Sequence, residues 1–131
     1  MYIEQFNSVE QIKECAKYYI ELLGLQSWKI IFLHTDEMDE ADWVGQCTSN
    51  FVKREAEIRI EKTHRKDFFK NPQELTLIHE LLHCKISMPE NETFENRMMY
   101  DSAHRLIDDM AKAIFNARYN MTNKDYYHEG E

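Results

Sequence analysis

The residues best able to do chemistry are two histidines four positions apart, with a glutamate directly after the first. They are His79, Glu80 and His83, in the pattern H-E-x-x-H. Side chains three and four residues apart lie on one face of a helix, so both imidazoles can reach one metal ion. Imidazole nitrogen is a common ligand of tetrahedral Zn²⁺, and a carboxylate one residue past the first ligand can act on a water molecule at the metal. The pattern therefore predicts a zinc site with Glu80 as general base.

The surroundings of the motif support this interpretation. Leu75, Leu82 and Ile86 fall near the face that carries the two histidines, which places the motif inside an amphipathic helix. The alternative is a surface helix whose two histidines have this spacing by chance. The amphipathic context favours the metal site.

Composition limits the class of protein. The chain has 131 residues, enough for one domain with a single hydrophobic core. Its net charge of −8 argues against a nucleic-acid-binding surface, where clustered Lys and Arg are expected. No apolar run approaches the ~20 residues of a membrane span, and the start of the chain lacks the pattern of a secretory signal. We expect one domain over residues 1–119, a flexible tail over 120–131, and no nucleic-acid or membrane partner.

The cysteines indicate a reducing compartment. Cys15, Cys47 and Cys84 are odd in number, far apart, and form no C-x-x-C pair. A disulfide framework is therefore not expected, and a cytoplasmic location fits best. Cys84 follows His83 but is rotated from it by about 100° around the helix axis. We interpret Cys84 as a buried thiol rather than a ligand.

Helices are predicted at both ends of the chain, with strands between them. A capping box at Ser8 and a helix-ending Gly24 enclose a first helix over 9–23. Short β-branched, aromatic or alternating segments then predict a small twisted sheet of three, or at most four, strands. The three strands are expected over 27–35, 43–52 and 54–62.

Two further helices are expected after the sheet. Proline is tolerated in a first helical turn and disfavours helix in the residue before it, so the motif helix is predicted over 72–87. A long helix is predicted over 94–117. Its core face is expected to carry Met99, Ala103, Leu106, Ile107, Met110 and Ile114.

This order of elements is an α+β fold that resembles the zincin metallopeptidases. More narrowly, it resembles the minimal zincin-like proteins of phages and integrated mobile elements. The order covers nearly the whole chain, and five contiguous residues match a specific motif. The resemblance implies that the strand over 54–62 is a sheet edge that pairs with an extended substrate. It also implies a Tyr or His that stabilises the oxyanion, for which Tyr100, His64 and Tyr127 are candidates.

A catalytic zinc site uses three protein ligands, so the motif leaves one to be found. The metzincin extension of the motif is absent, because Ile86 and Pro89 stand where it requires Gly and His. In the thermolysin-like branch the third ligand is a Glu of the next helix, and an Asp four residues later supports the first His. No Glu of this chain falls clearly into that place.

The candidates for the third ligand are His104, Glu95 and Asp101. At about 100° per residue, His104 lies roughly 90° from the centre of the predicted core stripe, Glu95 about as far off on the opposite flank, and Asp101 about 150° away. Asp108 follows His104 by one turn and reproduces the ligand-then-Asp spacing, as a carboxylate that orients an imidazole. We predict His104 as the ligand, with Glu95 and Asp101 as alternatives. The other interpretation is a partly buried histidine that faces Asp101 or Asp108.

These expectations describe a zinc-dependent peptidase acting on a peptide or protein substrate. One alternative is a peptidase dedicated to a single protein partner, such as a repressor. Another is a non-catalytic interaction module stabilised by zinc, and a third is a fold with inert histidines. A fourth protein ligand would favour the module, whereas an open fourth position would favour the enzyme.

Overall fold

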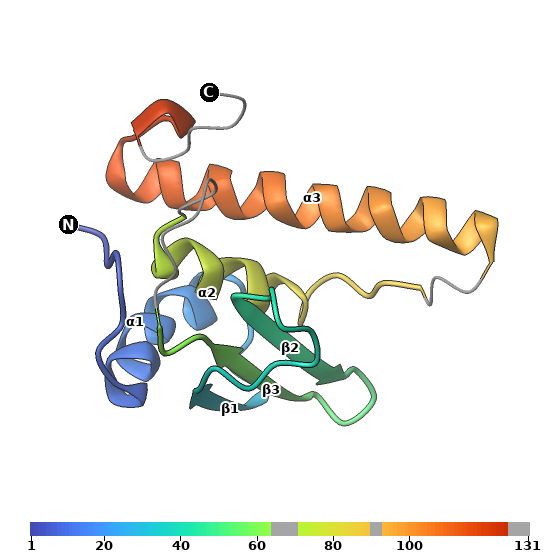
Figure 1. The fold of residues 1–131 in the computed structure, drawn as a ribbon, viewed down its shortest axis with the longest axis horizontal. Coiled ribbons are helices and arrows are strands. Elements are labelled where there is room, and N and C mark those ends of the chain that lie inside the picture. Colours follow the sequence, from blue (N-terminus) through green and yellow to red (C-terminus); the bar gives the residue numbers. More distant parts are fainter. Residues whose placement is uncertain (64–70, 90–92, 126–131) are drawn as a thin grey trace.

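The computed structural model describes residues 1–63, 71–89 and 93–125. Within these ranges it has three α-helices, one short 3-10 helix and three strands, which confirms the α+β class with an N-terminal helix and a long C-terminal helix (Figure 1). No helix in these ranges has the length and apolar character needed to cross a membrane. The elements in chain order are α1 (Val9–Leu22), β1 (Lys29–His34), β2 (Gly45–Asn50), β3 (Glu55–Ile60), α2 (Gln73–Leu82), α3 (Phe94–Tyr119) and the short 3-10 helix η1 (Asn123–Asp125).

The sheet is mixed, with strand order β1-β3-β2. β1 runs parallel to β3, and β2 runs antiparallel to it. Ala56, Ile58 and Ile60 are buried and alternate with the more exposed Glu55, Glu57 and Arg59, as the sequence predicted.

The expectation that the strand over 54–62 forms a sheet edge is wrong, because β3 is the central strand. A tight turn after Asn50, in which Arg54 has a positive φ of 54°, folds β2 back onto β3, while β1 occupies the other side. Alternating hydrophobicity reports which face of a strand is buried, but not which strands lie beside it. In the described part of the chain, the edges of the sheet are β1 and β2.

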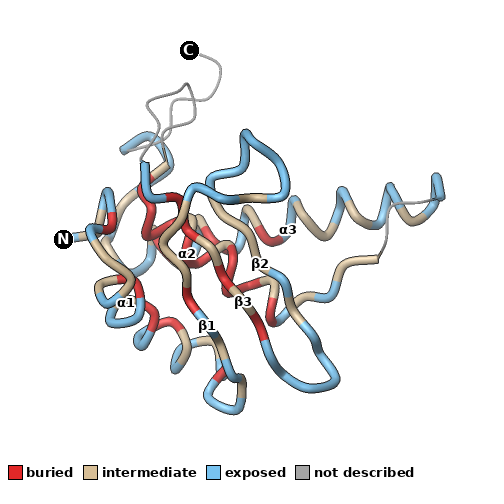
Figure 2. Tube along the Cα trace, turned by 60° about the horizontal axis from the view of Figure 1, so that its bottom comes forward, coloured by how far each residue is buried: buried red, intermediate tan, exposed pale blue. Residues whose placement is uncertain are grey.

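The helices form layers on one side of the sheet (Figure 1). α1 and α2 pack against the strands, and α3 packs on α2 rather than on the sheet. The tube coloured by burial shows the buried segments gathered between the sheet and these helices, while the first half of α3 extends past the rest of the molecule (Figure 2). α2 is therefore the central element, with the sheet on one side and α3 on the other.

The start of α2 is capped by the N-terminal segment of the chain. Pro72 provides no side-chain cap, but the N–H groups of Gln73 and Glu74 donate to the carbonyls of Glu4 and Ile3. The fully buried Glu74 carboxylate also accepts hydrogen bonds from the Ile3 N–H and from two tyrosine hydroxyls, one on α1 and one on α3. Arg118 of α3 lies 3.3 Å from the same carboxylate. One buried side chain therefore ties α2 to both other helices.

The ends of the helices differ from the predictions in two places. α1 ends as expected, with Gly24 at φ 70°. α2 ends at Leu82 rather than Ser87, because the N–H groups of Cys84 and Lys85 turn back to carbonyls three residues earlier. Part of the predicted tail also has structure, since Asn120 forms a left-handed cap of α3 and η1 follows.

The predicted core face of α3 is partly wrong. Met99, Leu106 and Met110 are 59%, 50% and 36% exposed, whereas Ile107 is fully buried. The face that packs on α2 carries polar residues such as His104 among its apolar ones, which weakens its hydrophobic signal. The prediction placed Met99 and Met110 in the core, which rotated the predicted core face away from the face that is buried in the structure.

Candidate metal centre

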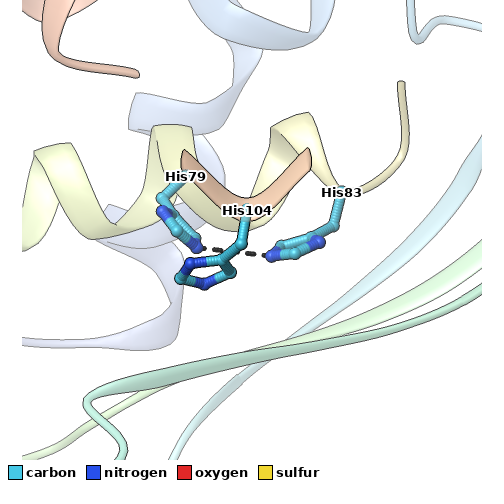
Figure 3. A group of neighbouring side chains, drawn as sticks. All are labelled: His79, His83 and His104. Atoms are coloured by element: carbon cyan, nitrogen blue, oxygen red, sulfur yellow. Dashed lines mark hydrogen bonds between the residues drawn. The ribbon is translucent and has the colours of Figure 1, made fainter. Parts of the chain in front are cut away.

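α2 positions the first two imidazoles of the site. His79 lies inside the helix, and His83 is the cap residue that follows Leu82. His83 keeps helical backbone angles, φ −63° and ψ −16°, so the two side chains retain the one-turn spacing of a helix. Their Nε2 atoms are 3.3 Å apart (Figure 3).

α3 brings a third imidazole to the same place. The ring of His104 lies 5.1 Å from that of His79 and 6.1 Å from that of His83, between centroids. One nitrogen from each of the three rings lies within 4.8 Å of the others, so this group could hold a metal ion. Glu95 and Asp101 are exposed and are not part of the group. The structure thus brings His104 to the motif, although its role as a ligand stays a prediction.

The spacing of the nitrogens suits a tetrahedral ion. Zinc–nitrogen bonds of roughly 2.0–2.1 Å imply that adjacent ligand atoms lie about 3.3–3.4 Å apart. The two Nε2 atoms of His79 and His83 already have that separation. This pair of nitrogens therefore has the spacing of two ligands of one tetrahedral ion, and the third ring is close enough to complete a three-ligand site.

Asp108 of α3 orients one of these rings. Its carboxylate accepts a hydrogen bond from Nδ1 of His79 at 2.7 Å, and its second oxygen lies 3.7 Å from Nδ1 of His104. A proton held on Nδ1 leaves the Nε2 lone pair of His79 free for a metal ion. The sequence had placed Asp108 beside an imidazole, and the structure shows that its closer partner is His79 on the other helix.

The three imidazoles have different electrostatic surroundings. Burial lowers the pKa of His79, but the hydrogen bond to Asp108 and the nearby Glu80 outweigh it and raise the pKa above its usual value. Burial and two neighbouring imidazoles lower the pKa of His83 to about 4. Burial raises the pKa of Asp108, but the hydrogen bond from His79 brings it below its usual value. His83 is therefore neutral at physiological pH, which is the form that binds metal ions.

Glu80 points from α2 into a different environment, on the side facing the sheet. It is only 6% exposed. Burial raises its pKa to about 7, against a smaller opposing effect of His79. A carboxyl group with a pKa near neutrality can both accept and donate a proton at physiological pH.

These side chains line a cavity of about 370 Å³ between the edge strand β2 and helices α2 and α3. Residues 42–47 form one wall, which runs along the end of β2 and the segment before it. Tyr100 lies in the opposite wall, stacked on His104 with 7° between ring planes. The other two candidates for the oxyanion, His64 and Tyr127, lie outside the described residues.

Two residues of the cavity wall, Gly45 and Cys47, were missed in the sequence. No motif marks them, because they approach α2 only through the pairing of β2 with β3. Cys84 is buried, as predicted, and faces Cys47 rather than the metal group. The hydrogen bond between the two thiols raises the pKa of Cys47 and lowers that of Cys84.

No family model, no curated protein and no solved structure matches the chain.

Proposed function

We propose that the chain is a zinc-dependent peptidase, with His79, His83 and His104 as zinc ligands and Glu80 as general base. The observation that supports this most directly is the meeting of three imidazoles and one buried carboxylate at one cavity. When bound, zinc supplies a Lewis acid that polarises the scissile carbonyl and lowers the pKa of a water molecule towards ~7. Three protein ligands with an open fourth position are the usual arrangement for such catalysis.

The residues of the chain have separate tasks in this proposal. Glu80 accepts a proton from the attacking water and donates it to the leaving amine, and its pKa of about 7 suits both transfers. Asp108 holds His79 in the tautomer that turns Nε2 towards the metal. Tyr100, in the cavity wall beside His104, is the proposed donor of a hydrogen bond to the carbonyl oxygen as it gains charge.

The substrate strand is proposed to pair with β2 instead of the segment over 54–62. β2 is an edge strand of the described sheet, and its first residues line the cavity. An extended peptide added to this edge would form main-chain hydrogen bonds and pass beside Glu80. The exposed Trp43 and Val44, next to this edge, offer apolar contacts to its side chains.

The non-catalytic zinc module has less support. A closed structural site needs a fourth protein ligand. The group contains three potential ligands among the residues that the structure describes, and an open cavity lies against it. This arrangement favours the enzyme.

Metal analysis together with one conservative variant tests the proposal. The purified protein should bind about one zinc per chain and cleave a mixture of fluorogenic peptides. Glu80→Gln keeps the shape of the side chain but removes the base, so this variant should retain zinc and lose hydrolysis. The absence of stoichiometric zinc, or equal hydrolysis by the variant, would reject the proposed function.

A further inference from the structure

Gly45 begins β2 and faces the motif helix. It pairs with Ile60 of β3, so it lies on the face of the sheet that packs against α2. A Cβ atom added to Gly45 would lie 2.7 Å from Cγ2 of Thr76 and 2.9 Å from Oε2 of Glu80. Cβ atoms in proteins essentially never approach other heavy atoms within 3.0 Å. No residue other than glycine fits here unless Thr76 or Glu80 moves.

The need for glycine at this position is one of space rather than of backbone conformation. The only glycine with a positive φ in the described ranges is Gly24, so the backbone of Gly45 is one that other residues can adopt. A strand position also normally favours a residue with a side chain, because glycine weakens a strand. The distinctive feature of Gly45 is the close approach of the Glu80 carboxylate to the strand.

This approach fixes one limit on the position of Glu80. The side chain lies between α2 and β2, and its carboxyl carbon would be 3.3 Å from the added Cβ. Ordinary van der Waals contact begins at about 3.4 Å, so Oε2 would have to retreat by about 0.5 Å. Because Glu80 is only 6% exposed and lies between α2 and β2, any such movement would change where the carboxylate sits in the cavity.

We propose that Gly45 is a positioning residue for Glu80. The missing side chain lets the edge strand lie directly against the carboxylate. The absence of a side chain thereby fixes the distance between β2, which is proposed to bind the substrate, and Glu80, which is proposed to transfer the proton. This inference rests on the proposed function, because it assigns the position of Glu80 a role in hydrolysis.

Two measurements test it, and the first is independent of activity. Glu80→Ala removes Oε2 and the carboxyl carbon, two of the three atoms nearest to the new methyl group, and leaves Cγ2 of Thr76. The effects of Gly45→Ala and Glu80→Ala on stability should therefore not be additive. In urea unfolding, Gly45→Ala should raise the unfolding equilibrium constant about tenfold or more in the wild-type background. The increase should be clearly smaller in the Glu80→Ala background. Equal effects in both backgrounds would overturn the inference.

The second measurement is hydrolysis of fluorogenic peptides by the zinc-loaded protein. Gly45→Ala should keep its zinc, because the atoms nearest to the new methyl group belong to Thr76 and Glu80 and not to the three histidines. It should lose about 100-fold in kcat/KM, as small misplacements of catalytic groups do. Gly45→Ala with Thr76→Ser removes the methyl contact with residue 76 and keeps the one with Glu80. This double variant secures a folded protein and should show the same loss relative to Thr76→Ser alone. Lys29→Ala is the control, at an exposed position of β1, away from both β2 and the cavity wall, and should be fully active.

The outcomes separate this inference from the proposed function. An active wild type with an equally active Gly45→Ala variant would overturn the inference and leave the peptidase intact. A wild type that cleaves none of the peptides would count against the proposed function, and the unfolding experiment would then decide alone whether Gly45 positions Glu80.

Discussion

His79, Glu80 and His83 are close in sequence, yet their side chains have different surroundings. The two histidines face α3 and lie beside its residues Asp108 and His104, whereas Glu80 faces the sheet. Burial lowers the pKa of His79, but its hydrogen bond to Asp108 and the nearby Glu80 raise it overall. Burial lowers the pKa of His83 and raises that of Glu80. In the proposed function, one turn of helix would thereby present metal ligands on one side and an acid–base group on another.

The role of His104 can be tested by removal of its side chain. His104→Ala would leave two ligands, so zinc affinity should fall by orders of magnitude, measured by competition with a chromogenic chelator. Glu95→Ala and Asp101→Ala are the controls on the same helix and should leave the affinity nearly unchanged. If either control empties the site while His104→Ala does not, His104 is not the third ligand.

The buried Glu80 should also leave a signature in the pH dependence of stability of the metal-free protein. Its pKa of about 7 lies above the usual 4.5, so it stabilises the folded state at low pH, and this contribution is lost as pH rises from 4.5 to 7. His83 acts in the opposite direction. Its pKa is lowered from 6.5 to about 4, so its contribution is present above pH 6.5 and is lost as pH falls towards 4.

Glu80→Gln removes one of these two opposing contributions. As the pH falls from 7 to 4.5, the metal-free wild type gains stability from protonation of Glu80, and the variant does not. The unfolding free energy of the variant should therefore fall by about 3 kcal/mol relative to that of the wild type, at about 1.4 kcal/mol per pKa unit. Urea unfolding in excess chelator at the two pH values measures this difference. Identical pH dependence of the two proteins would show that Glu80 titrates normally in the fold.

At the scale of elements, the sequence predicted the ends of the first helix well, but it did not predict which strands lie side by side in the sheet. The capping box at Ser8 and the glycine at 24 defined α1 closely, because caps are local. The central place of β3 was not predictable, because it depends on pairing with segments before and after it. Glycine weakens a strand by its residue type, and only the structure shows the Glu80 carboxylate beside Gly45.

The long helix shows why His104 was the hardest part of the candidate site to predict. Its apolar residues form more than one stripe, and the sequence does not say which stripe is buried. The structure turns His104 towards α2 because the core runs through Ile107, Ala111 and Phe115. The proximity of His79 and His83 follows from the geometry of one helix. The proximity of His104 to them depends on how two helices pack, which the sequence does not show.

The rotation of α3 predicts unequal effects for two adjacent residues. Ile107 is fully buried and Leu106 is 50% exposed. Ile107→Ala should therefore cost about 2–5 kcal/mol of unfolding free energy, the usual range for a buried aliphatic side chain. Leu106→Ala should cost less than about 1 kcal/mol, as measured in urea unfolding. Similar losses from the two variants would contradict this orientation of α3.

At the scale of the whole molecule, the two halves of α3 are held differently. The C-terminal half is fixed to α2 and α1 through the buried Glu74, its tyrosine donors and Arg118. The first half extends past the body of the protein (Figure 1). His104 and Tyr100 belong to this half and line the cavity beside α2. A metal ion bound by α2 and α3 together would add a fixed connection at this point.

Zinc should therefore stabilise the molecule and protect a particular region of it. Binding to the folded state alone raises the unfolding free energy by about 1.4 kcal/mol for each tenfold increase in free zinc above the dissociation constant. The melting temperature should rise with zinc accordingly, and excess chelator should reverse the rise.

Hydrogen exchange should slow most at amides of α3 around His104, because the ion would join that turn to α2, and least near Phe115, which is already anchored. Magnesium, which prefers oxygen ligands, is the control and should change neither measurement. An even slowing along α3, or none, would mean that His104 does not connect the two helices through the metal.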